Sequence, residues 1–328
     1  MINQRFYPLF RQVFLEIEET LWLWDCDTGH QRQLHRALDK LRQDFWADRV
    51  FPALMGPWLS WGALGREPDA ALRGLGVAHV LFYAFLDLTD DVEDHELNPA
   101  QWSSDSEAVA INTGTGLLFL ALLALERLAE VGITAPQISE LRLMFCQAGW
   151  RLTAGQYRDL TSVAVPLGET AFALETIRLK TGTSVRLYFQ SAARLAGADP
   201  VLEEMLGLFG EQLGLLAQLR GDYLNLFVQP TSSDLSNGCR TLPLHLAFTH
   251  LSPDDRELLE TALKQAVTDQ AAHTVIRHLL RKSDCRTSLN LRLEACRTEA
   301  ERLLGQLDAQ GCQIAELSLF LSRLQNLD

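Results

Sequence analysis

The chain has 328 residues, of which 47% are hydrophobic and 22% charged, a composition that excludes disordered, collagen-like and low-complexity proteins. With 29 Lys and Arg against 42 Asp and Glu, the formal net charge is −13. Because so acidic a protein repels phosphate backbones, we expect no nucleic-acid partner, and an anionic substrate would need local cations or a bound metal.

Apolar residues recur at steps of three and four along most of the chain, which predicts helices. One such face runs from Phe6 to Ile17 and another from Leu81 to Leu88, and no alternating strand pattern is convincing. Helix breaks are expected at the Gly- and Pro-containing positions Gly56-Pro57, Gly65 to Pro68, Asn98-Pro99, Gly132 to Pro136, Gly197 to Pro200, Pro230 to Gly238 and Ser252-Pro253. The pattern favours one all-α domain over residues 1–328 with ten or more helices, in which residues 1–44 supply the N-terminal helices.

Three features of the sequence indicate the cellular compartment: an uncharged run, the N-terminal segment and the cysteines. The uncharged run from Ala108 to Leu125 contains Asn112 and glycines, so we expect a helix buried inside a bundle and no membrane span. Acidic residues interrupt the N-terminal segment where a signal peptide would be apolar. The six cysteines form no CxxC pair, which favours reduced thiols, no zinc site and a cytoplasmic protein.

Four aspartates are spaced so that they share one helical face: Asp87, Asp90, Asp91 and Asp94. The residues around them are apolar, so the helix should be largely buried, where clustered carboxylates repel each other. A divalent cation would offset that repulsion, since Mg²⁺ prefers oxygen ligands and commonly bridges carboxylates to a phosphate. From spacing alone, a solvated acidic helix end is an equally good interpretation.

A second polar group lies much later in the chain, where Gln218, Asp222 and Asn225 fall on consecutive turns. Between the two groups, Lys180 is one of four lysines in the sequence and lies among apolar residues, where a cation needs an anionic partner. Together the groups could bind metal ions and a diphosphate across a bundle cavity. Taken alone, the second polar group is also typical of an ordinary helix end, and Lys180 is also typical of a surface lysine whose stem packs on apolar neighbours.

Five short motifs occur in a fixed order along the chain. Asp90–Asp94 reads DDVED, Gly155–Leu160 reads GQYRDL, Lys180–Gly182 reads KTG, Gln218–Asn225 reads QLRGDYLN, and Gly238–Pro243 reads GCRTLP. These resemble the first aspartate-rich motif DDxxD, the GQxxDL segment, the KTG motif, the second aspartate-rich region and the GKxTLP stretch of the trans-isoprenyl diphosphate synthases, the polyprenyl synthetase family. The similarity in order and spacing extends over nearly the whole chain.

The resemblance implies a fold, a metal and a substrate. The fold would be an isoprenoid (terpenoid) synthase-type bundle of mostly antiparallel helices around a central apolar cavity. Roughly two or three Mg²⁺ ions would be held by the metal ligands Asp90, Asp91, Asp94, Asp222 and Asn225. The substrate would be an allylic prenyl diphosphate, such as geranyl, farnesyl or geranylgeranyl diphosphate, and the protein would be a homodimer.

The resemblance also assigns roles to individual residues. The catalytic set comprises Asp90, Asp91, Asp94, Lys180, Thr181, Gln218 and Asp222. The substrate-binding set comprises Phe85, Asp87, Gln156, Asp159, Arg186, Arg240 and Tyr223. Phe85 stands where the family sets chain length, and its bulky ring favours a ten- or fifteen-carbon chain.

Cations with which the family binds isopentenyl diphosphate are missing. In Ala47–Pro52, which corresponds to the GKxxRP motif, Asp48 stands at the lysine position and Phe51 at the last arginine position. The arginine pair that usually follows the first motif is absent, and Gly221 stands where the second region should begin with aspartate. We therefore predict transfer of the prenyl group to another acceptor, such as an indole, a phenol, a peptide or a glycolipid. The alternatives are a terpene cyclase, a conventional short-chain synthase and a non-catalytic partner subunit.

Overall fold

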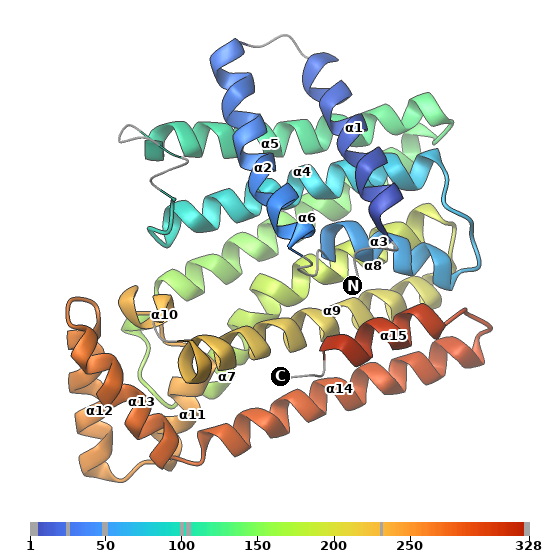
Figure 1. Ribbon diagram of the computed structural model, residues 1–328. Helices are drawn as coiled ribbons and strands as arrows, with labels where there is room; N and C mark the ends of the chain where they lie inside the picture. Colours follow the sequence, from blue (N-terminus) through green and yellow to red (C-terminus); the bar gives the residue numbers. More distant parts are fainter. Residues whose placement is uncertain are drawn as a thin grey trace. The chain divides into compact units, whose positions relative to one another are not determined.

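The computed structural model describes residues 6–23, 27–47, 52–98, 102, 106–229 and 232–324, and every regular element in these ranges is a helix (Figure 1). The all-α prediction is therefore confirmed. The α-helices are α1 Tyr7–Leu23, α2 Thr28–Trp46, α3 Pro52–Ala63, α4 Ala70–Glu93, α5 Ser106–Glu126, α6 Ala135–Leu160, α7 Thr170–Ile177, α8 Thr183–Leu195, α9 Pro200–Tyr223, α10 Ser233–Ser236, α11 Leu242–His250, α12 Pro253–Ala266, α13 Gln270–Lys282, α14 Cys285–Ala309 and α15 Ala315–Leu324. The described residues also include the 3₁₀ turns η2 Arg127–Val131 and η3 Ser162–Ala164 and the π turns η4 Arg178–Gly182 and η5 Leu224–Val228.

The chain divides into two compact units, each built from separate stretches of sequence. The first comprises Met1–Gln147, Leu187–Gly207 and Leu307–Leu317, and the second comprises Ala148–Arg186, Leu208–Gln306 and Ser318–Asp328. The prediction of one domain over residues 1–328 stays a prediction.

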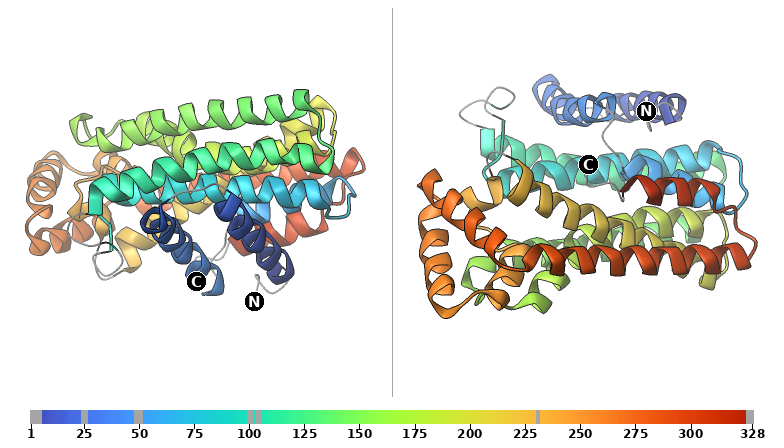
Figure 2. Two further views of the ribbon diagram at one scale, coloured as in Figure 1. Left: turned by 90° about the horizontal axis from the view of Figure 1, so that it is seen from above. Right: turned by 60° about the horizontal axis from the view of Figure 1, so that its bottom comes forward.

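The first unit is organised around α4, which packs against α3, α5 and α1. Asp69 caps the start of α4 by accepting a hydrogen bond from the Leu72 N–H at 2.9 Å, as expected for an N-cap aspartate. Helices α1 and α2 cross α4 and α5 (Figures 1 and 2). The buried residues of α2, Leu34, Leu38, Leu41 and Phe45, recur every three or four positions, so one face of α2 packs against the unit.

Gly56-Pro57 was expected to break a helix, and this prediction is wrong because both residues lie inside α3. The proline removes a single backbone donor, and burial of the surrounding turns outweighs that loss. Gly56 allows the side chains of Tyr188 and Phe189 to pack closely against the backbone of α3. A Cβ at this position would come within 3.0 Å of atoms in both side chains. The other expected breaks within the described residues lie at or between helix ends, but the stretch from Pro230 to Gly238 contains the short helix α10.

Two helical segments, Ala70–Glu93 and Glu107–Val131, are long and apolar enough to cross a membrane by length and composition alone. This is weak evidence, because core helices of water-soluble proteins meet the same criteria. The helix expected over residues 108–125 is confirmed as part of α5. The expectation that this helix is buried inside the bundle is wrong. The most apolar 18-residue stretch of Glu107–Val131 is 44% buried, and the side chains of Ile111 and Phe119 lie exposed.

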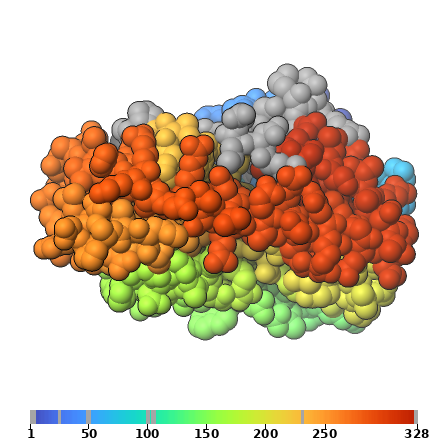
Figure 3. Space-filling view, turned by 90° about the horizontal axis from the view of Figure 1, so that it is seen from below, coloured from blue at the N-terminus to red at the C-terminus, as the bar shows by residue number. Residues whose placement is uncertain are grey.

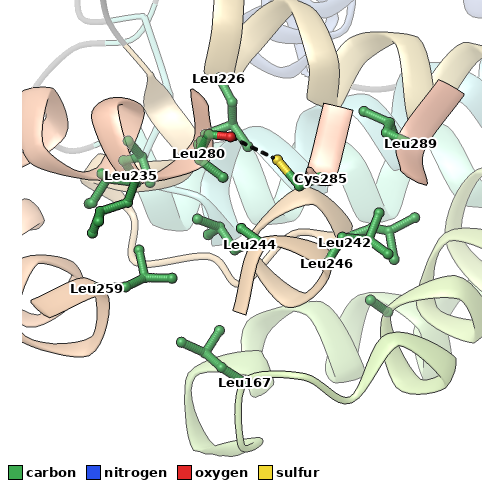
Figure 4. Packing of buried hydrophobic residues seen from close by; sticks show 14 of the residues in the cluster. Leu167, Leu226, Leu235, Leu242, Leu244, Leu246, Leu259, Leu280, Cys285 and Leu289 are labelled. Carbon is green, nitrogen blue, oxygen red and sulfur yellow. Dashed lines mark hydrogen bonds between the residues drawn. The ribbon is translucent and has the colours of Figure 1, made fainter. Parts of the chain in front are cut away.

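The second unit has its own core of buried leucines. Leu226, Leu235, Leu244 and Leu280 meet there, and the Cys285 thiol donates a hydrogen bond to the Leu280 carbonyl at 3.2 Å (Figure 4). Helices α12 and α13 pack against one another, and α14 extends from them (Figure 2). Figure 3 shows the outer surface of these three helices in orange to red. No disulfide joins the cysteines of the described part of the chain, and the expectation of reduced thiols stays a prediction.

Candidate active site

The first acidic group lies at the carboxyl end of α4. Asp87, Asp90 and Asp91 occupy its last two turns, and Asp94 is the C-cap, whose N–H donates to the Asp90 carbonyl at 2.8 Å. His95 follows with a left-handed φ of 57°, which ends the helix. The predicted spacing on one face therefore holds for three aspartates, and the fourth lies one residue beyond the helix.

Lys40 of α2, which sequence reasoning did not identify, contacts this acidic group. Its ammonium lies 2.7 Å from the Oδ2 atoms of both Asp87 and Asp91. Burial raises the pKa of each carboxyl, and Lys40 opposes that shift. Burial lowers the pKa of Lys40 itself, but the two carboxylates outweigh it, so the pKa of the lysine is raised.

Phe85 lies two residues before Asp87 in α4 and is half-buried. Its ring centroid is 6.0 Å from that of Phe82, and its carbonyl accepts a 2.8 Å hydrogen bond from the Thr89 hydroxyl. Opposite it, a Cβ added to Gly114 of α5 would lie 3.8 Å from the Phe85 ring. Phe85 therefore packs against α5, while its role in chain length stays a prediction.

In the second unit, Lys180 lies in the π turn η4 and its ammonium pairs with Asp159 Oδ2 of α6 at 2.8 Å. Two glycines let neighbouring helices approach the backbone of this turn. A Cβ at Gly155 of α6 would lie 2.6 Å from the Lys180 backbone nitrogen, and one at Gly214 of α9 would lie 2.7 Å from the Thr181 carbonyl oxygen. The π turn is thus held between α6 and α9, and irregular turns of this kind are frequent at functional sites.

The Gly214→Ala variant is expected to unfold more easily, by about 1–3 kcal/mol, because its methyl group would overlap backbone atoms. Gly221 of the same helix is the matched control, since a Cβ there would meet nothing within 4 Å. Gly221→Ala should raise the free energy of unfolding by about 0.5–1 kcal/mol through helix propensity. Urea unfolding of the two variants checks this, and equal destabilisation would contradict it.

A chain of hydrogen bonds connects η4 to the second acidic group. The Thr181 hydroxyl donates to Gln218 Oε1 at 2.7 Å, and Gln218 Nε2 donates to Asp222 Oδ1 at 2.9 Å. Asp222 is 4% exposed, and burial, followed by the charge of Asp234, raises its pKa to about 7. Gln218 therefore fixes the orientation of a buried carboxyl group that is poorly solvated when ionised.

Ionisation of Asp222 is expected to make metal-free stability fall as the pH rises. Its pKa is about 7 in the folded chain against an ordinary 3.8, so between these values the folded state binds the proton that the unfolded state has released. The free energy of unfolding should then drop by up to about 1.4 kcal/mol per pH unit in this window. Asp222→Asn should remove this contribution, and denaturant unfolding of both proteins at pH 5 and pH 8 measures the difference.

Asn225 lies beyond Asp222, within the π turn η5. The wider turn changes the helical period, and Asn225 bonds to hydroxyl groups that follow it in the chain. Its Nδ2 donates to Ser233 Oγ at 3.2 Å, and its Oδ1 accepts from the Ser232 hydroxyl. Its assignment as a metal ligand stays a prediction.

Four further predicted residues have defined surroundings in the second unit. Arg186 lies 3.3 Å from Glu211 of α9, and the Arg240 guanidinium donates to the Val165 carbonyl. Tyr223 is buried in the leucine core, where its ring stacks on Phe227 at 5.1 Å. Both amide atoms of Gln156 are buried without a hydrogen-bond partner within the described residues.

The family model of the polyprenyl synthetases matches residues 54–280. The chain belongs to the polyprenyl synthetase family. It is 29% identical to the farnesyl diphosphate synthase of Geobacillus stearothermophilus over 68% of this chain and 80% of that protein. It is 27% identical to the (2E,6E)-farnesyl diphosphate synthase of Mycobacterium tuberculosis over 68% of this chain, and the match spans 64% of that protein's length. A solved geranylgeranyl pyrophosphate synthetase from Pyrococcus horikoshii has the same all-α fold, with a TM-score of 0.77 at 18% identity over 98% of this chain and 96% of that one.

The donor atoms of this polyprenyl synthetase suit Mg²⁺ in their chemistry. Asp90, Asp91, Asp94 and the buried Asp222 all supply hard carboxylate oxygens. Within the described ranges, no three His, Cys, Asp or Glu side chains gather closely enough to hold a metal alone. Mg²⁺ in phosphate-handling enzymes is usually held by one or two carboxylates together with substrate oxygens, so the residues present fit that mode.

Two parts of the sequence prediction lie outside the described residues. Asp48 and Phe51, which replace cations of the isopentenyl diphosphate motif, belong to residues 48–51, and part of the stretch after the first motif falls in residues 99–101 and 103–105.

Proposed function

We propose that the protein is a Mg²⁺-dependent prenyltransferase that ionises an allylic prenyl diphosphate. The observation that carries this proposal is the presence, in a polyprenyl synthetase, of both an acidic helix end and a lysine-centred polar network with a buried carboxyl group. The farnesyl diphosphate synthases among its relatives support prenyl transfer, whereas they lend no support to the cyclase alternative.

Each group would perform a separate task. Asp90, Asp91 and Asp94 would hold metal at the first motif, and Asp222 would do so at the second. Bound Mg²⁺ supplies positive charge that stabilises the departing diphosphate. Lys180 would exchange the Asp159 carboxylate for a phosphate oxygen and neutralise part of the charge that develops there.

The hydrogen-bonded residues beside Lys180 would keep this arrangement rigid. Gln218 accepts from Thr181 and donates to Asp222, so both neighbours are fixed in position before substrate binds. A pre-oriented carboxyl group needs less rearrangement to bind a cation, which is how rigid surroundings contribute to catalysis.

For the acceptor, we propose a molecule other than isopentenyl diphosphate. Support comes from the sequence, where Asp48 and Phe51 replace cations and an aspartate would repel a diphosphate. The second candidate is a conventional short-chain synthase, which the names of the relatives favour. A non-catalytic partner subunit is the remaining alternative.

We also propose that the chain forms a homodimer. Ile111 and Phe119 of α5 and Leu143 of α6 are apolar side chains that lie exposed in the isolated chain. Ile111 and Phe119 are eight residues apart and so lie on one side of α5, and exposed apolar side chains that share a helix face favour association with another protein surface. Light scattering after size-exclusion chromatography measures the mass directly, and a monomer at micromolar concentration would contradict the proposal.

The function is tested by measuring diphosphate release from geranyl, farnesyl and geranylgeranyl diphosphate, with and without Mg²⁺. Release that depends on Mg²⁺ supports prenyl diphosphate ionisation. The same reactions with isopentenyl diphosphate distinguish the candidates, because elongated products only in its presence would identify a conventional synthase. Absence of release under all conditions would leave the partner-subunit alternative.

A further inference from the structure

Lys40 forms an ion pair of an unusual kind with the acidic end of α4. Its ammonium lies at the same distance, 2.7 Å, from Asp87 and from Asp91. The side chains of both aspartates are 22% exposed and that of Lys40 is 34% exposed, so all three are partly withdrawn from water. Ion pairs in such places interact more strongly than pairs on an open surface.

The two aspartates that share the lysine differ in their proposed roles. Asp91 belongs to the first metal-binding motif, whereas Asp87 lies one turn earlier in α4 and outside the DDxxD pattern. The Asp91 atom that contacts the ammonium is Oδ2, one of the two oxygens with which this carboxylate would bind metal.

An ammonium and a magnesium ion compete for the same oxygen. Mg²⁺ binds carboxylate oxygens at about 2.0–2.1 Å. With Lys40 still 2.7 Å from that oxygen, a dication and an ammonium would lie within a few ångströms of each other. Metal binding at Asp91 therefore favours withdrawal of the lysine.

We propose that Lys40 is a built-in counter-ion of the first acidic motif, which binds Asp91 in the metal-free chain and is displaced from it by a divalent cation. The inference rests on the proposed metal-binding role of Asp91. Asp87 gives the displaced ammonium a partner that it already contacts, so the exchange needs a side-chain movement and no separation of α2 from α4. This assigns functions to two residues outside the family motif, Lys40 as the displaced cation and Asp87 as its second partner.

The first test measures Mg²⁺ binding to the substrate-free protein by calorimetry. Lys40→Met should bind Mg²⁺ at least about tenfold more tightly than the wild type, because the competing cation is gone. Asp87→Asn should bind it several-fold more weakly, because Lys40 then has Asp91 as its remaining carboxylate partner. Unchanged or weaker binding by Lys40→Met would overturn the proposal.

A double variant separates displacement from a general change of charge. Lys40→Met with Asp87→Asn has the net charge of the wild type but leaves no ammonium on Asp91, so tighter binding than in the wild type is expected. Affinity equal to that of the wild type would mean that only the summed charge matters and would overturn the exchange. Lys282→Met is the matched single control, because Lys282 pairs with both oxygens of Asp255 in the second unit and its loss should leave Mg²⁺ affinity unchanged.

A second measurement uses the unaltered protein and so does not depend on the folding of a variant. The sequence contains four lysines, so amine acetylation followed by mass spectrometry can report on each. Acetylation of Lys40 should become several-fold faster when Mg²⁺ is added, whereas that of Lys282 should not change. Saturation with Mg²⁺ without faster acetylation of Lys40 would overturn the exchange.

These outcomes are distinct from a failure of the proposed function. Mg²⁺-dependent diphosphate release with an unresponsive Lys40 would refute the exchange and leave the function standing. A Lys40 that responds to Mg²⁺ in a protein that releases no diphosphate would support the exchange and refute the function.

Discussion

Replacing Asp90 with alanine is expected to lower Mg²⁺-dependent diphosphate release by about a hundred- to a thousandfold, the usual cost of removing one pre-oriented electrostatic group. Asp90 lies in the last turn of α4, and its carbonyl accepts the hydrogen bond that caps the helix. That bond uses the backbone, so it survives the substitution. The variant should therefore keep its helical content while losing activity.

The control for this experiment is Asp39→Ala. Asp39 lies on α2 in the same unit, is 53% exposed and pairs with Arg42, one turn along the helix. Surface pairs of this kind contribute little to stability, and activity should stay within about twofold of the wild type. Circular dichroism and thermal unfolding accompany both assays. Unfolding of Asp90→Ala, or activity equal to that of the wild type, would contradict a metal-binding role.

The sequence was sufficient to predict the fold because the relevant signal is local. Apolar residues at helical spacing identify α1 and α4, and Ser252-Pro253 marks the start of α12 through an N-cap followed by proline. The same local rules failed at Gly56-Pro57, where close packing against Tyr188 and Phe189 decides the structure. Such a contact joins residues that are distant in sequence, and no local pattern contains it.

In the candidate site, too, local motifs could be predicted from the sequence, whereas contacts between distant residues could not. Asp90 and Lys180 were identified from motifs, but Lys40 was not, since its importance depends on how α2 packs on α4. Its rarity as one of four lysines was an available signal, although rarity does not specify a partner. Gly214 was missed because a glycine within a helix does not disclose whether another backbone approaches it. The π turn η5 likewise altered the surroundings that ideal spacing predicted for Asn225.

Replacing Lys180 with methionine is expected to lower kcat/KM for the allylic diphosphate by about a hundredfold, since a fixed cation that meets the leaving group would be lost. Methionine preserves most of the length of the side chain, and the close approaches at Gly155 and Gly214 involve backbone atoms of the π turn. The turn should therefore keep its structure. Steady-state kinetics with and without Mg²⁺ measure the effect, and thermal unfolding reports on stability.

Asp159→Asn distinguishes a substrate-binding lysine from a structural ion pair. The substitution removes the carboxylate that holds Lys180 at 2.8 Å but leaves the ammonium available to a phosphate. If Lys180 acts on the substrate, Asp159→Asn should cost less than about tenfold in kcat/KM, far less than Lys180→Met. If the pair serves only to join α6 to η4, both variants should lose activity and thermal stability to the same extent, because either substitution breaks the same contact. Equal losses would therefore exclude Lys180 from diphosphate binding, whereas a large activity loss in Lys180→Met alone would place its charge on the substrate.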